Sequence, residues 1–459
     1  MTRPDVATGF DLTPPGRVLF ALEDPTDVFD PATEFGTNAP LSGDIPEHGY
    51  DTPDANVAPR IGFSFRATEN TVVRAGGGIF YAGNTNTNQL SDIQQQGGLF
   101  TLRDEQIIAG NEQLPPLDVR DLFPRAVSDV IPQPYEDPPA TPRTLGQLEY
   151  GPPTVYQWSL SIQHRFHSRW SVNLDYLGSR TVHNNQFVDL NAPLLPQGDL
   201  ADVPLQERRP LPGWGRIGSW VPWGWSKYHS ATFGVTNRQW HGLTLRSSLT
   251  WSKDLSSSNV RQSDHGNLDF RSFDLWAGRS ELVPTVRSIT GWTYELPWGQ
   301  GRPFPLRGVM NLTLGGWNLS GKAEFSDGAP QGILTNDNTG SALTRQHADR
   351  IPGCDSTDAP EDRFEWFNIS CFAQPAFGTF GTGAQGLINA PGINNLDLRI
   401  GKVFPLSGTT RMEFLANFFN ALNHTQWGGV NTQFDSPNFG RITSARRARQ
   451  ISFELRLIF

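Results

Sequence analysis

Residues 450–459 read QISFELRLIF, and this stretch decides the fold class. Its apolar side chains recur at every second position: Ile451, Phe453, Leu455, Leu457 and Phe459. A period of two, with mostly polar residues between, predicts a β-strand that has one apolar and one polar face. The length suits a strand that crosses a bilayer at a tilt, for which about 9–11 residues are enough. The alternative is the last strand of a soluble β-sandwich, although soluble chains usually fray into polar residues at their ends.

The composition of the whole chain is compatible with two classes of protein, a soluble protein and a membrane barrel. Charged residues make up 18% of the 459 residues, and the mean hydropathy is −0.42. No apolar run reaches the ~18 residues that a transmembrane helix needs. Glycine, proline, tryptophan and phenylalanine are abundant, which favours many short strands joined by turns. The net charge of −9 is spread without a basic block, so we expect no nucleic-acid partner.

Alternating segments occur in pairs along the chain before the terminal strand. Residues 1–57 are rich in Pro, Asp and Gly without a period, and we predict that they form an N-terminal loop region. Residues 58–459 are predicted to hold about 11 strands. The predicted strands before the terminal one span 58–66, 71–81, 154–166, 169–180, 228–238, 242–253, 284–296, 315–325, 394–404 and 409–421.

The connections between these strands alternate between shorter turns and long loops. The long loops are 82–153, 181–227, 254–283, 326–392 and 422–447. An up-and-down outer-membrane barrel has short turns in the periplasm and long loops outside, whereas a sandwich has no reason to keep that order. Aromatic residues stand at both ends of the strands, as in the two girdles of a membrane barrel: Phe166, Trp170, Trp317 and Phe404 at one end, and Tyr156, Trp158 and Trp251 at the other. The fold class predicted is therefore all-β, an antiparallel up-and-down transmembrane β-barrel.

Several stretches of the chain carry a family resemblance. They include APRIGFSFR (58–66), VYQWSLSIQHRF (155–166), LTLRSSLTWSK (243–253), GGWNLSGKAEFSDGAP (315–330) and NFGRITSARRARQISFELRLIF (438–459). These stretches resemble the C-terminal barrel region of TonB-dependent outer-membrane receptors of the Oar-like kind. The resemblance runs from about residue 58 to the end. It implies a place in the cell outer membrane and a barrel of about 22 strands around an N-terminal plug. It also implies import driven by the TonB complex, and barrel assembly machinery that reads the aromatic pattern of residues 451–459.

The chain departs from that family pattern in its extent. About 11 strands are half of such a barrel, and the sequence shows no plug, TonB-contacting segment or signal peptide. Loop 254–283 also lacks the arginine-rich motif expected before Val286. We therefore expect a partial barrel, a C-terminal fragment whose first strand is left as an edge and which TonB reaches only through the missing N-terminal part.

The function expected is ligand binding and uptake by the barrel portion of a receptor, with an unknown ligand. The alternatives are a non-transporting structural or adhesive surface protein, an inactive gene fragment, and a secreted carbohydrate-binding module. We expect no enzyme activity and no cofactor. Gly76–Gly78 lies inside a strand pattern rather than before a helix, and His164 and His167 lack a third ligand. Asp264–His265 also lacks a further ligand, Asn336–Asn338 departs from the calcium-loop pattern, and Glu361–Asp362 reads as ordinary loop charge.

Arginines on the polar faces of the strands have two interpretations. They line a substrate path, or they pair with acids of the barrel wall, and the second is favoured for each residue. The arginines are Arg60, Arg74, Arg246, Arg287, Arg399, Arg411 and Arg456. The acids of the barrel wall include Asp175, Glu295, Asp397, Glu413 and Glu454.

Cys354 and Cys371 are the only cysteines, and both lie in a loop predicted to be extracellular. That compartment favours disulfides, so we predict a bond between them. The bond would stabilise the fold by about 3 kcal/mol, because it removes conformational entropy from the unfolded chain. A metal-binding pair is the alternative, but the spacing lacks a CxxC and His347 stands alone nearby. Free thiols are expected if the chain stays in the cytosol.

Overall fold

The computed structural model describes residues 56–82, 143–145, 152–189, 191–210, 215–216, 218–257, 268–341, 343 and 345–459. Most of the region predicted as N-terminal loop, 1–57, lies outside these residues, so the boundary at residue 57 stays a proposal. Most of loop 82–153 also lies outside the described residues, which include β3 (Arg143–Leu145).

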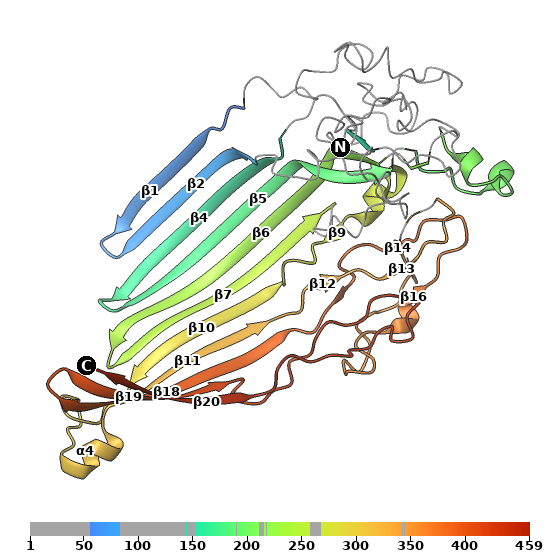
Figure 1. Cartoon of the computed structure of the whole chain (residues 1–459). Coiled ribbons are helices and arrows are strands. Elements are labelled where there is room, and N and C mark those ends of the chain that lie inside the picture. The colour runs from blue at the N-terminus through green and yellow to red at the C-terminus, as the bar shows by residue number, and fades with distance from the viewer. Residues whose placement is uncertain are drawn as a thin grey trace, which may run out of the picture.

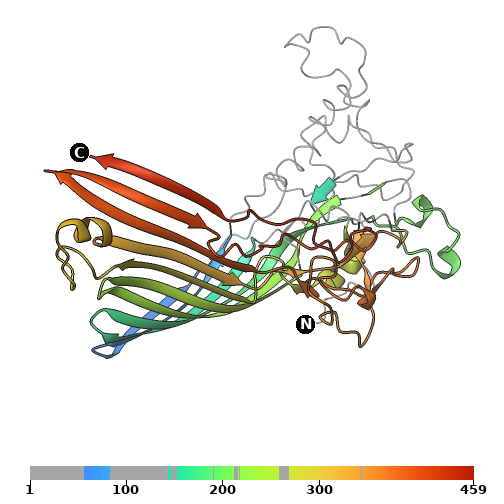
Figure 2. The same ribbon diagram turned by 90° about the horizontal axis from the view of Figure 1, so that it is seen from below.

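One large sheet contains eleven strands in an unbroken antiparallel path, in the order of the sequence (Figures 1 and 2). The path is β1 (Arg60–Thr68), β2 (Thr71–Tyr81), β4 (Thr154–His167), β5 (Trp170–Asp189), β6 (Gly218–Trp240), β7 (Leu243–Ser256), β10 (Val286–Glu295), β11 (Trp317–Ser326), β18 (Ile393–Ser407), β19 (Thr410–Phe419) and β20 (Gln450–Ile458). The sheet is curved but unclosed, with β1 and β20 at its two edges. The predicted strand number and antiparallel order are confirmed.

Two strands extend well beyond their predicted ends. β5 has 20 residues and continues to Asp189, and β6 has 23 residues and begins at Gly218, where we predicted loop from 181 to 227. The register shifts twice in this extension, between Thr181 and Gln186. The sequence there, for example GSWVPWGW (218–225), is aromatic without alternating, so the period of two does not identify it.

The strand register sorts the side chains into an apolar face and a polar face. One row of paired residues on the apolar face runs Leu245, Trp292, Gly321, Leu398, Phe418 and Ile451. One row on the polar face runs Ser64, Arg74, Ser161, Asp175, Thr232, Thr250 and Arg287. Apolar side chains are left uncovered, with Phe453 70% and Leu455 66% exposed. An apolar surface of this extent needs a lipid or protein partner.

All short turns lie at one end of the sheet, which we call the short-turn end, and the long loops gather at the other (Figure 1). The connection between β10 and β11, at the short-turn end, contains a helix, α4 (Gly308–Leu314). None of the helices in the described part of the chain is long and apolar enough to cross a membrane.

The loops at the opposite end fold into a compact structure that we call the cap, formed by the described residues of 190–217, 257–285, 327–392 and 420–449. Its small elements are η3 (Gly198–Leu200), η4 (Gln206–Arg208), β8 (Leu268–Asp269), η5 (Phe270–Trp276), β9 (Gly278–Arg279), β12 (Pro330–Gln331), β13 (Leu334–Asn336), β14 (Arg345–His347), β15 (Asp349–Arg350), η6 (Ile369–Cys371), β16 (Phe372–Ala373) and β17 (Ile388–Asn389). A cluster of buried residues lies here, including Ile333, Phe367 and Phe372, rather than on the sheet. The cap therefore has an ordinary hydrophobic core, while the sheet has an exposed apolar face.

Candidate functional site

The polar face of the sheet is lined mainly by small hydrogen-bonding side chains. Thr232 and Thr250, on neighbouring strands, share a hydrogen bond of 2.9 Å. The Ser161 hydroxyl donates to Asp175 at 2.5 Å, and the Asn173 amide donates to the other carboxylate oxygen. Such a face is wettable and compatible with a passage for polar ligands.

Several charged side chains on the β10–β20 part of this face are paired with one another. Arg287 lies 2.8 Å and Lys322 2.9 Å from the Glu324 carboxylate. The Arg411 and Glu413 side chains lie 3.4 Å apart, and Arg456 pairs with Glu454. The interpretation as wall ion pairs is therefore confirmed for Arg287, Arg411 and Arg456.

The remaining predicted pairings differ from our expectation. Arg399 donates to the Asn417 amide oxygen at 2.7 Å rather than to a carboxylate. Glu295 pairs with Arg302 from the connection after β10. Asp397 accepts hydrogen bonds from the Asn395 amide at 3.0 Å and the Asn420 backbone at 2.9 Å.

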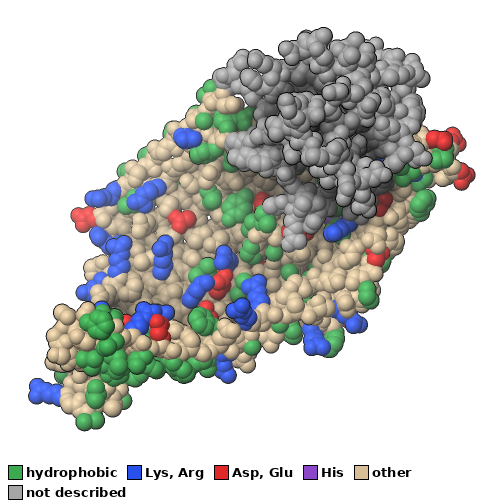
Figure 3. Space-filling view, in the orientation of Figure 1, with side chains coloured by type: hydrophobic (Ala, Val, Ile, Leu, Met, Phe, Trp, Pro, Cys, Tyr) green, Lys and Arg blue, Asp and Glu red, His purple; other side chains and the backbone are tan. Residues whose placement is uncertain are grey.

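Arginines on the β1–β7 part of the polar face lack carboxylate partners within the described residues. The Arg60 guanidinium lies 4.6 Å from the Phe80 ring centroid, and Arg74 donates to Gln163 at 3.4 Å. Arg246 pairs in register with Thr236 and Gly291, neither of which carries charge. Lys and Arg side chains gather over the sheet face turned to the viewer in Figure 3. This half of the face therefore offers positive charge to an anionic ligand.

Four more arginines meet at the short-turn end, around a cleft of about 320 Å³ lined by Arg66, Arg165, Arg169 and Arg238. Asn70 accepts two hydrogen bonds from Arg165, at 3.0 and 3.3 Å, and the Gln239 carbonyl accepts one from Arg169 at 2.5 Å. Glu69 is the carboxylate in the lining. The alternation of the strands does not predict this cluster. The signal in the sequence is that each of the four arginines stands close to a short turn, so that the strand ends bring them together.

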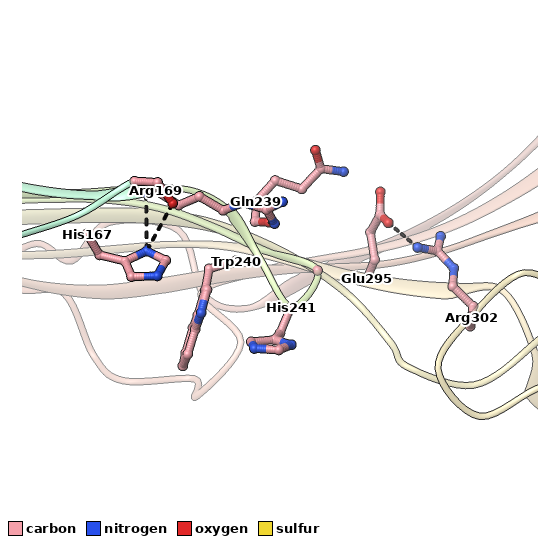
Figure 4. Close-up of a pocket in the computed structure, with 9 residues that line it drawn as sticks. His167, Arg169, Gln239, Trp240, His241, Glu295 and Arg302 are labelled. Atoms are coloured by element: carbon pink, nitrogen blue, oxygen red, sulfur yellow. Dashed lines mark hydrogen bonds and ion pairs between the residues drawn. The ribbon is translucent and has the colours of Figure 1, made fainter.

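A second cleft of about 650 Å³ opens beside it, between the β4–β5 turn, the β6–β7 turn and the end of β10 (Figure 4). Figure 4 shows Arg302 pointing toward Glu295 on one side and His167 beside Arg169 on the other. The rings of Trp240 and His241 lie 4.7 Å apart in its lining. These groups can bind an anion or a polar ligand.

The other candidate residues from the sequence occupy structural positions. Gly76–Gly78 lies within β2, opposite β4, and His164 shares a 2.9 Å hydrogen bond with Thr71. Asp337 caps its own turn by accepting the Thr339 amide at 2.8 Å, and Asp362 accepts the Phe364 amide at 2.7 Å. Across the described residues, no three His, Cys, Asp or Glu side chains group as metal ligands. Asp264 and His265 lie outside the described residues.

The cap joins loops that are far apart in sequence. Asp435 accepts hydrogen bonds from the Thr335 hydroxyl at 2.9 Å and the Asn336 amide at 2.6 Å. Arg279 donates to the Gly386 carbonyl at 2.8 and 2.5 Å. Cys354 and Cys371 are joined in a disulfide with Cα atoms 5.3 Å apart, against the buried cluster. Their state in cells, and the extracellular place of the loop, stay predictions.

Buried arginines tie another loop into the cap. The Arg209 guanidinium lies 3.5 Å from Asp189, with side chains 7% and 5% exposed, and it donates to the Asn191 carbonyl at 2.6 Å. Burial lowers the pKa of Arg209, and Asp189 opposes that shift. Arg208 donates to the Gly340 carbonyl at 2.8 Å and to the Leu194 carbonyl. The cap is thus a built surface rather than a set of independent loops.

Comparison with known proteins gives one family and a set of structural likenesses. Residues 16–452 match the family described as outer membrane beta barrel domain. No curated protein matches the chain. The outer membrane transporter YddB from Escherichia coli is similar at 9% identity and a TM-score of 0.45. The matched region covers 87% of this chain and 40% of the YddB chain.

Two further structures are similar at the same level. The FrpB iron transporter from Neisseria meningitidis has 10% identity and a TM-score of 0.42, with 89% of this chain and 40% of its own covered. BauA, the ferric preacinetobactin receptor from Acinetobacter baumannii, has 10% identity and a TM-score of 0.39, with 87% and 36% covered. The chain spans about two-fifths of the length of these proteins.

Proposed function

The chain belongs to the outer membrane beta barrel domain family, and from that premise we propose that it is the C-terminal barrel portion of a TonB-dependent receptor that binds a ligand and takes it up. As a member of this family it lies in the outer membrane and is not an enzyme. In this proposal the ligand is unknown and the TonB complex drives its uptake. Contact with TonB is made by an N-terminal part that precedes this chain.

One observation carries the proposal: the sheet separates an uncovered apolar face from a hydrogen-bonding polar face along all eleven strands. In a membrane barrel the apolar face meets lipid and the polar face lines the lumen. The short-turn end then faces the periplasm and the cap faces the medium. Among the described residues Arg60, Arg74 and Arg246 have no carboxylate partner. They favour an anionic ligand, because a guanidinium forms strong charge-assisted hydrogen bonds with carboxylate or phosphate groups.

The proposal is tested by uptake in the native cells. Cells are grown on a panel of anionic nutrients, each supplied at a growth-limiting concentration. We expect deletion of the coding sequence and deletion of TonB to abolish growth on the same nutrient. The double deletion should cause no further growth defect, because both single deletions block the same uptake path. Arg74→Gln with Arg246→Gln should reduce that uptake about ten-fold, given ~1.5–3 kcal/mol for a hydrogen bond to a charged group. Uptake equal to wild type after deletion, for every nutrient, contradicts the receptor function.

The folded cap favours one alternative function, a surface protein that binds partners through its loops without transport. Its hydrophobic core, disulfide and buried Arg209–Asp189 pair give it a defined shape. If deletion changes cell adhesion or envelope integrity and leaves every uptake rate intact, the structural or adhesive function is the better one. If neither changes, the chain is an inactive remnant.

A further inference from the structure

Helix α4 is an apolar surface segment that the barrel function does not explain. Its sequence is GVMNLTL (308–314), without an acidic or basic residue in its first or last turn. Four apolar side chains are largely exposed: Val309 75%, Met310 57%, Leu312 61% and Leu314 57%. Phe304 and Trp298, just before the helix, are 60% and 46% exposed. A seven-residue helix is marginal in water unless other groups hold it.

The sheet holds α4 by the carbonyl groups of its last turn. The Lys402 ammonium donates to the Leu312 carbonyl at 2.6 Å, and the Trp317 indole donates to the Thr313 carbonyl at 2.9 Å. Such carbonyls lack partners within a helix and carry partial negative charge, so a cation placed there is favourable. These two contacts fix the helix to the large sheet through β11 and β18.

These contacts also place α4 on the apolar face of the sheet. Lys402 pairs in register with Trp317 and Phe414, which belong to that face. The Lys402 ammonium lies 5.2 Å from the Trp317 ring centroid and 5.1 Å from that of Phe404, and the residue is 2% exposed. A lysine on a lipid-facing wall is costly, and the helix carbonyl and the rings compensate it.

We propose that α4 lies in the periplasmic leaflet of the outer membrane and anchors the barrel there as an interfacial helix. Val309, Met310, Leu312 and Leu314 continue the apolar face into the boundary between headgroups and acyl chains, which is where such helices bind. Arg307, exposed at the start of the helix, reaches the lipid phosphates. Phospholipid fits better than a protein partner because the segment continues a surface that already faces lipid.

Fluorescence quenching tests this placement. A Met310→Cys variant of the full chain, labelled with an environment-sensitive dye, is reconstituted in vesicles that contain nitroxide-labelled phospholipid. Labelling is selective because the two native cysteines are disulfide-bonded. Glu69→Cys, in the exposed β1–β2 turn at the same end, is the matched control.

We expect the dye at position 310 to emit at shorter wavelength, to be quenched at least two-fold by the lipid nitroxide, and to be shielded from aqueous iodide. The dye at position 69 should show the reverse. Val309→Cys and Leu314→Cys should behave as Met310→Cys does, which protects the test against one misfolded variant. Iodide access at position 310 equal to that at 69 overturns the anchor. Shielding from both quenchers assigns α4 to a protein partner and overturns it as well.

Discussion

Two tryptophans of the apolar face lie flat over glycines of the next strand. Trp158 pairs in register with Gly178, and Trp292 pairs with Gly321. A methyl group at Gly178 would lie 2.4 Å from the Trp158 ring, and one at Gly321 would lie 2.3 Å from the Trp292 ring. The missing side chains therefore make room for the rings, an arrangement that protects exposed backbone. Sequence alternation places the tryptophans on the correct face, but it does not reveal this contact between strands.

Gly321→Ala should destabilise the barrel because the Trp292 ring must leave its position. We expect a loss of about 1–3 kcal/mol, the usual cost of overpacking. Urea unfolding in lipid, followed by tryptophan fluorescence, measures it. Gly291→Ala is the control, since nothing lies within 4 Å of a methyl group there. Equal midpoints for the two variants would show that the ring contact has no energetic weight.

Cys354 and Cys371 close a loop with a sequence separation of 17. Mass spectrometry of non-reduced peptides from envelope material should show the two joined. Cys371→Ser should loosen the cap by about 3 kcal/mol, seen as faster proteolysis of residues 355–370. If both cysteines are alkylated without reductant, the disulfide is absent in cells and the extracellular place of the loop loses its support.

The Asp355 carboxylate holds the turn that follows Cys354. The Thr357 hydroxyl donates to it at 2.7 Å and the Thr357 amide at 2.9 Å, and these bonds lower the pKa of Asp355. A lowered folded-state pKa contributes stability above the unfolded value of about 4, and that stability is lost as pH falls through the folded-state value.

We therefore expect proteolysis of the cap to be constant from about pH 7 to 5 and to rise below about pH 4. The Asp355→Asn variant should show a weaker rise. Some of it should persist, because backbone amides of Glu365 and Phe364 also lower the pKa of Asp362. An unchanged pH profile in the variant would exclude Asp355 as a contributor.

The eleven sheet strands show which elements the sequence can predict. Strands with strict alternation can be predicted to within a few residues, as for β4 and β20. The outer parts of β5 and β6 were not, because they lie past the alternating pattern and depend on pairing with each other. Helix α4 was not predicted either, since seven residues without a charged face give no helical period and its stability comes from Lys402 and Trp317.

The last strand, β20, pairs with β19 and forms one edge of the sheet. We expect deletion of Phe459, or Phe453→Asp with Leu455→Asp, to block insertion of the receptor into the outer membrane. The physical reason is that this apolar face must enter lipid, and assembly machinery is expected to read its aromatic pattern. Surface levels are measured by accessible labelling of intact cells. Ser452→Asp on the polar face is the control, and normal levels of the Phe453 and Leu455 variant would refute the assembly signal.

At the scale of the molecule, the sequence predicts the large sheet better than the cap. Alternation is a local pattern, so the strands of the sheet and its two faces can be predicted from the sequence alone. The cap depends on contacts between distant loops, such as Asp435 with Thr335 and the Phe367–Phe439 ring contact at 5.3 Å. The same limit applies to the charges of the sheet. Arg287 pairs with Glu324, which lies diagonally opposite on the next strand and is not among the acids named from the sequence.

The two faces of the whole sheet should differ most clearly in their tolerance of charge. Leu245 on the apolar face pairs with Trp292, whereas Ser248 on the polar face pairs with Ile289 and Gly234. Leu245→Arg should cost ~2–4 kcal/mol in lipid, because the cation is placed among acyl chains near the bilayer midplane. Ser248→Arg should cost much less, since the lumen is wet. Unfolding titrations of both variants in the same vesicles measure the difference. Equal costs would mean that the uncovered face of this sheet meets water or protein and that the chain is not arranged as a membrane barrel.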